Sequence, residues 1–203
     1  MKSLSEIDTV SKRASRAIGF SWGVAEEVGK NIRLLEMFGL PGIKNLNNFF
    51  KVKKNSKFEN LDLINKDNKS VNFQLCPINV GINFLDQINA IENLGEVTFQ
   101  KIAYPLLFLP FVSRASEIIG KRLSLKINER EFLLSFNSSI YSNFLTNEII
   151  NLAENVSVKF LDNSDSFNQN EWEELYKLSK DTFVEESDSL KQSGAGAGLT
   201  DND

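Results

Sequence analysis

The chain has 203 residues, of which 41% are hydrophobic and 25% charged, and its formal net charge is −4. This composition is typical of a globular protein that can bury a core without disulfides or a structural metal. The sequence has no histidine and one cysteine, Cys76, which excludes Ser-His-Asp and Cys-His catalysis, most zinc and copper sites, and disulfide frameworks.

No segment has the pattern of a signal peptide or a membrane span. The first six residues lack the apolar core of a leader. The longest apolar run, residues 104–112, contains two prolines and is far shorter than the roughly 20 residues that a spanning helix needs. We therefore expect a cytoplasmic protein that makes no membrane contact and keeps its thiol reduced.

Charge is distributed unevenly along the chain. Residues 1–57 hold 11 Lys/Arg against 5 Asp/Glu, whereas residues 162–203 hold 3 against 11. The two ends can therefore pack together or meet different partners. The lysines of residues 51–57 accompany no nucleic-acid motif, so we interpret them as a solvated loop and expect no nucleic-acid partner.

Three helices are predicted in the first 50 residues. Ser3 stands three residues before Glu6, as in a capping box, and Gly19 ends the first helix. Ser21 caps the second helix, which the sequence Gly-Leu-Pro-Gly at residues 39–42 terminates. A short third helix is predicted at residues 43–50.

The rest of the chain alternates between strand and helix patterns. Residues 55–70 are polar and rich in turn formers, which indicates a loop. Residues 123–127 and 132–136 predict a β-hairpin, and residues 106–119 fit a buried strand or a helix. The remaining predictions are strands at 71–75, 97–102 and 156–161, and helices at 80–92, 147–155 and 170–183.

These elements predict an α+β fold. Its N-terminal helices pack on a mostly antiparallel sheet, and a C-terminal helix and a Gly-rich tail follow. We expect one domain over residues 1–203, with residues 1–57 as a candidate helical subdomain and the tail at residues 190–203.

Two glycines, Gly23 and Gly29, interrupt the second predicted helix at a cost of about 1 kcal/mol each relative to alanine. The simpler interpretation is close helix packing at both glycines, with Trp22 in the core and Glu26 paired with Lys30. The alternative is a polar surface that faces a ligand or a partner, formed by Glu26, Glu27, Lys30 and Arg33. A carboxylate beside a lysine can also transfer protons once burial shifts their pKa values.

Cys76 lies at a predicted strand-to-helix turn. A helix N-terminus lowers a thiol pKa and can make a nucleophile of it. A free cysteine is more commonly a small buried hydrophobe, however, and we favour that role for Cys76.

Arg114 follows a very apolar segment. It can be a buried anchor for a carboxylate or a phosphate, which the guanidinium binds through two hydrogen bonds. We favour the other interpretation, a pair with Glu117 on a solvated face.

The Gly-rich tail resembles a phosphate-binding loop but has no Lys-Ser/Thr pair and no following helix, so we interpret it as a flexible end. We assign no metal site. An ordered tail is the alternative, in which Asp201, Asp203 and the terminal carboxylate form an acidic cluster that takes Mg²⁺ or Ca²⁺.

Several motifs together resemble a bacterial family catalogued as a domain of unknown function. They are Ser5-Glu6, GFSWGVAEEVGK at residues 19–30, GLPG at 39–42, Cys76-Pro77 with Gly81, and GAGAGLTDND at 194–203. The resemblance implies a small cytoplasmic protein with an ordered tail, and it supplies no catalytic residues.

The leading functional hypothesis is a non-catalytic accessory protein that binds a metabolite or a partner protein, because this composition supplies no standard catalytic set. The alternative is a small-molecule enzyme that uses carboxylate and lysine acid–base chemistry or Cys76. A homo-oligomer is a third possibility, and no particular cofactor is indicated. The candidate ligand-binding residues are Trp22, Glu26, Glu27, Lys30, Cys76, Arg114, Asp201 and Asp203.

Overall fold

A computed structural model describes residues 2–143 and 148–182. The chain divides into two compact units, Met1–Asn163 and Ser164–Asp203, which are treated separately below. A single domain over the whole chain stays a prediction. In the described ranges, no helix combines the length and the apolar character needed to cross a membrane.

The first unit begins with the three predicted helices, α1 (Leu4–Ala17), α2 (Trp22–Met37) and α3 (Gly42–Lys53). The Ser3 hydroxyl accepts a hydrogen bond from the Glu6 N–H at 3.1 Å, which caps α1. The Ser21 hydroxyl caps α2 in the same way through the Val24 N–H. Local sequence signals therefore fix where these helices start. Because α3 continues to Lys53, the first part of the lysine-rich stretch is helical rather than a loop.

A six-stranded sheet follows, in the order β1-β2-β6-β3-β4-β5. Its edge strand β1 runs parallel to β2, and all other neighbours are antiparallel. The predicted hairpin is confirmed as β3 and β4, with Ile127 opposite Arg130. The strands are β1 (Asp67–Asn68), β2 (Glu96–Ala103), β3 (Arg122–Ile127), β4 (Arg130–Ser135), β5 (Ser139–Ser142) and β6 (Leu152–Leu161).

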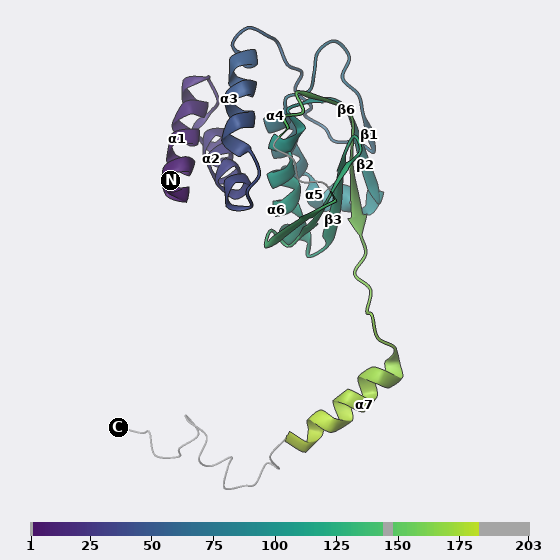
Figure 1. Cartoon of the computed structure of the whole chain (residues 1–203). Helices are drawn as coiled ribbons and strands as arrows, with labels where there is room; N and C mark the ends of the chain where they lie inside the picture. The colour runs from purple at the N-terminus through teal and green to yellow at the C-terminus, as the bar shows by residue number, and fades with distance from the viewer. Residues whose placement is uncertain (1, 144–147, 183–203) are drawn as a thin grey trace, which may run out of the picture. The chain divides into compact units, whose positions relative to one another are not determined.

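The helices of the first unit gather on one side of this sheet (Figure 1). α4 (Pro77–Asp86) and α6 (Leu109–Ile119) lie next to the sheet, and α1–α3 lie beyond them. The core between sheet and helices includes edge-to-face aromatic contacts, in which Phe108 lies 5.3 Å from Phe99 and 5.5 Å from Phe84 between ring centroids. The predicted α+β class, with helices before a mostly antiparallel sheet, is confirmed.

Three sequence predictions in this unit are wrong in detail. Residues 71–73 form a bend instead of a strand, with the Glu59 carboxylate accepting the N–H groups of Val71, Asn72 and Phe73. Of the predicted strand only Leu75 makes β-bridges, to Glu59 and Ile102. Residues 152–155 belong to strand β6 rather than to a helix, since they pair with β2 from Gln100 to Ala103. The predicted helix at 80–92 begins earlier, at Pro77, and is broken into α4, α5 (Ile88–Ile91) and the 3₁₀ turn η1 (Glu92–Leu94).

The ambiguous segment at 106–119 is helical. The 3₁₀ turn η2 (Pro105–Leu107) leads into α6, which ends at Gly120 with a φ of 63°. This left-handed conformation suits glycine and terminates the helix.

The second unit contains the predicted C-terminal helix. α7 (Gln169–Ser179) is followed by the 3₁₀ turn η3 (Lys180–Thr182). Asn168 and Glu171 form a complete capping box at its start. The predicted tail at 190–203, with Asp201 and Asp203, lies outside the described residues.

Candidate functional site

A polar pocket of about 320 Å³ lies where α2, α6 and the turn between β4 and β5 meet. Three of its lining residues are cationic, two carry side-chain amides and two are apolar. They are Lys30, Arg33 and Arg114, Asn31 and Asn137, and Leu34 and Met37. Such a mixture of positive charge and amides suits an anionic ligand.

The position of α2, which supplies five of these residues, depends on close packing against α1. A Cβ built on Gly29 would lie 2.6 Å from Asp8 Oδ1 and 2.8 Å from the Asp8 carbonyl oxygen. Only glycine allows the two helices to approach this closely. The predicted tight packing at Gly29 is therefore present, whereas a Cβ on Gly23 would meet nothing within 4 Å.

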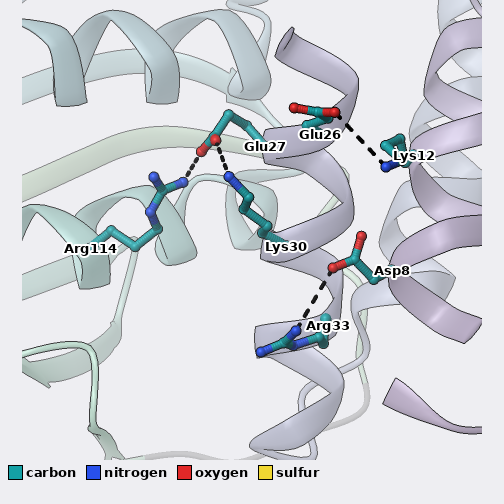
Figure 2. A network of polar contacts seen from close by, with 7 residues as sticks. All are labelled: Asp8, Lys12, Glu26, Glu27, Lys30, Arg33 and Arg114. Carbon is teal, nitrogen blue, oxygen red and sulfur yellow. Dashed lines mark hydrogen bonds and ion pairs between the residues drawn. The ribbon is translucent and has the colours of Figure 1, made fainter. Parts of the chain in front are cut away.

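One carboxylate links the cations on the α6 side of α2. Glu27 binds Arg114 Nη1 through Oε2, and Lys30 Nζ donates to its Oε1 at 2.9 Å. Figure 2 shows the carboxylate between the two cationic side chains. Arg114 forms its ion pair with Glu27 of α2. The sequence analysis favoured Glu117 as its partner.

The environment of Arg114 is partly desolvated. Burial lowers the pKa of its guanidinium, while the neighbouring charge of Glu117 opposes this shift. An arginine nevertheless keeps its charge at neutral pH. A half-buried cation of this kind binds an anion more strongly than an exposed one, because water screens the interaction less.

Two further ion pairs connect α2 to α1 (Figure 2). Glu26 faces Lys12 at 3.9 Å, and Arg33 faces Asp8 at 4.0 Å. Glu26 therefore pairs with α1 instead of with Lys30, and it does not line the pocket. Arg33 does line it, so its guanidinium lies between Asp8 and the pocket.

Asn31 is the most unusual residue of the site. Its side chain is 3% exposed, yet neither Oδ1 nor Nδ2 has a hydrogen-bond partner among the described residues. Leaving buried polar atoms unpaired costs about 1–3 kcal/mol per group, so most such atoms in native proteins are satisfied. Asn31 is among the residues that line the pocket, but its two amide atoms are themselves buried, so they are not exposed to a ligand there.

The amide of Asn137 is held by α6. Phe136 and Asn137 both adopt left-handed backbone conformations, with φ of 49° and 56°. The buried Ser113 hydroxyl donates to Asn137 Oδ1 at 3.0 Å. This bond uses one of the two acceptor positions of the amide oxygen and leaves the Nδ2 donors available.

The N-terminal helices carry the match to a known family. Residues 2–73 match the family described as protein of unknown function (DUF3726). The predicted resemblance to a domain of unknown function is thus confirmed over this part of the chain. The match includes the five pocket residues of α2 and ends before Arg114 and Asn137. No curated protein and no solved structure matches the chain.

The structure brings together three of the residues proposed from sequence: Lys30 and Arg114 line the pocket, and Glu27 contacts both. Trp22 does not lie in the core, since it is 60% exposed and stacks under the Arg16 guanidinium at 4.7 Å from the ring centroid. It does not line the pocket either.

Cys76 also lies away from the pocket, at the N-cap of α4. Its side chain is buried in the hydrophobic core. Burial raises the pKa of this thiol more strongly than the N–H groups of Asn79 and Ile78 lower it. Burial therefore outweighs the lowering of the thiol pKa that a helix N-terminus would cause. The position of Cys76 in the core agrees with the role of a small buried hydrophobe, which the sequence analysis favoured.

The sequence interpretation missed four residues of the pocket. Asn31 had a visible signal, because it lies three residues after Val28 and four before Leu35 on the buried side of α2. A polar residue in an apolar stripe needs an explanation. Leu34, Met37 and Asn137 gave no comparable signal, since only the tertiary packing places them in one wall.

Proposed function

We propose that this protein is a non-catalytic accessory protein that binds a small anionic metabolite in the pocket lined by Lys30, Arg33 and Arg114. One observation carries the proposal: three cationic side chains, those of Lys30, Arg33 and Arg114, line the same pocket. The proposal includes a cytoplasmic location, for which the single, free and buried thiol is the support.

The charge of the pocket favours an anion. Arg114 and Lys30 share one carboxylate, that of Glu27, and Arg33 is 4.0 Å from Asp8. Besides these two carboxylates, the charge of Glu117 acts on Arg114. A ligand carboxylate or phosphate would compete with these carboxylates for the three cations and accept charge-assisted hydrogen bonds.

The same contacts favour binding over catalysis. The catalytic alternative predicts that Glu26, Glu27, Lys30, Arg114 and the tail converge on one pocket with Cys76 within reach. Glu26 and Cys76 do not line this pocket, and the tail lies outside the described residues. Both oxygens of Glu27 are engaged by cations, so this carboxylate is poorly placed to take a proton from a substrate.

Calorimetric titration of the full chain with acetate, succinate and inorganic phosphate tests the proposal. We expect at least one of them to bind, and Arg114→Gln to weaken that binding at least about tenfold, since a hydrogen bond to a charged group contributes about 1.5–3 kcal/mol. Glu27→Gln should tighten binding, because it removes the internal carboxylate that competes for Arg114 and Lys30.

Lys121→Gln is the matched control. Lys121 has a side chain of similar exposure to that of Arg114, at 30% against 28%, and it pairs with Glu92 outside the pocket. The control variant should bind like the wild type. Absence of binding by all three anions, or equal affinities of the wild type and Arg114→Gln, would refute the proposal.

A further inference from the structure

We infer that the ligand is a monocarboxylic acid with a short apolar chain. Its acid group binds Lys30 and Arg114, and its chain lies along α2 against Leu34 and Met37. The inference rests on the proposed function and adds the chemical class of the ligand.

The residues of α2 that line the pocket change character along the helix. Lys30, Arg33, Leu34 and Met37 all line it, and their spacing of three and four residues places them on one face of α2. Met37 follows Lys30 by seven residues, so this row extends over about 10 Å of the helix axis. A ligand that follows the row passes from charged to apolar surface.

The charged end of the row suits a single acid group. Glu27 accepts hydrogen bonds from both Lys30 and Arg114, which brings these two cations together. Arg33 is directed toward Asp8 of α1, at 4.0 Å (Figure 2). One carboxylate placed between Lys30 and Arg114 therefore meets two donors, whereas a second acid group would have to compete with Asp8 for Arg33.

The pocket is poor in acceptors for the rest of a polar ligand. Among the described residues that line it, side-chain oxygens come from Asn31 and Asn137. The amide atoms of Asn31 are buried, and the Asn137 oxygen already accepts a hydrogen bond from Ser113. The hydroxyl groups of a sugar or the ammonium group of an amino acid would lose water here without gaining enough partners, which opposes their binding.

An apolar chain avoids that cost and finds partners at the other end of the row. Met37 is 50% exposed although it is apolar, and Leu34 beside it is partly buried. A chain that covers them removes apolar surface on both sides from water, and the flexible methionine adapts to its shape. The volume of about 320 Å³ lies near the lower end of the range of about 300–1,000 Å³ for ligand pockets, as expected for a small acid.

Calorimetric titration of the full chain with straight-chain monocarboxylates of two to eight carbons tests the inference. Each methylene that leaves water should tighten binding about twofold to fourfold, until the chain extends past Met37. Adipate is the matched probe for hexanoate, because it has the same number of carbons and a second charge at the far end. That charge would have to leave water against Leu34 and Met37, so adipate should bind at least about tenfold more weakly than hexanoate.

Two variants locate the chain of the ligand. Met37→Gln keeps the length of the side chain but makes its end polar, and it should reduce the ratio of hexanoate affinity to acetate affinity. Val10→Gln is the matched control, since Val10 is 58% exposed and lies in a different, apolar groove between α1 and α3, which Ile43 and Phe50 also line. This control should keep the wild-type ratio.

The outcomes separate this inference from the proposed function. Equal affinities along the series, tighter binding of adipate than of hexanoate, an unchanged ratio in Met37→Gln or a reduced ratio in Val10→Gln would each overturn the inference. The proposed function stands in all these cases if Arg114→Gln still weakens anion binding. If neither the acids nor phosphate bind the wild type, both are overturned.

Discussion

Replacing Gly29 by alanine has two opposite effects on stability. The helix propensity of residue 29 improves, but the packing between α1 and α2 becomes too tight. Alanine inside a helix is favoured over glycine by about 1 kcal/mol. At Gly29, however, the new methyl group would lie 2.8 Å from the backbone oxygen of Asp8 and 2.6 Å from its side-chain Oδ1. The side chain can rotate away, but the backbone oxygen can move only if α1 moves.

The magnitude follows from these two opposing effects. Overpacking of this kind costs about 1–3 kcal/mol, and part of that cost is offset by the gain in propensity. We expect Gly29→Ala to lower the free energy of unfolding by up to about 2 kcal/mol. For a chain of this size that corresponds to a fall in melting temperature of up to about 8 °C.

Gly23→Ala provides the control within the same helix. No atom lies within 4 Å of the Cβ position of Gly23, so only the propensity gain applies, and the variant should be as stable as the wild type or up to about 1 kcal/mol more stable. Urea unfolding followed by circular dichroism measures both variants. A Gly29→Ala protein as stable as Gly23→Ala would refute the proposed close contact between α1 and α2.

Two further predictions concern the core and the loop after α3. Burial raises the pKa of Cys76, so its thiol should react with iodoacetamide at pH 8 only after urea is added, and rapid alkylation of the folded protein would contradict this environment. The three N–H bonds to Glu59 lower the pKa of its carboxyl. Its stabilising effect is therefore complete above its ordinary pKa of 4.5 and is lost as the pH falls through the lower folded value. The difference in urea midpoint between wild type and Glu59→Gln should accordingly be constant near pH 7 and shrink in acid, and a pH-independent difference would exclude this role.

The N-terminal helices and the hairpin could be predicted because their signals are local. Caps at Ser3 and Ser21 mark helix starts, and alternation over a few residues marks β3 and β4. β6 was only half predicted, since residues 152–155 have no clear strand pattern and acquire strand structure from pairing with β2.

The residues of the candidate site, too, could be predicted only in part from local sequence patterns. Glu27, Lys30 and Arg114 could be singled out by residue type, but the contact of Glu27 with Arg114 joins residues 87 positions apart. No local pattern encodes that distance. That Asn31 is buried with its amide unpaired is visible only in the packed structure.

The place of β6 in the sheet has a consequence for how the protein reaches its native state. β6 joins β2 to β3 and is the last strand of the sheet along the chain. Until residues 152–161 are available, β2 and β3 expose unpaired edges to solvent and to other chains. Pairing Glu96 with Lys159 also closes a long loop, and such non-local contacts slow folding. The sheet should therefore form late, and a chain truncated before β6 should aggregate rather than remain as a stable fragment.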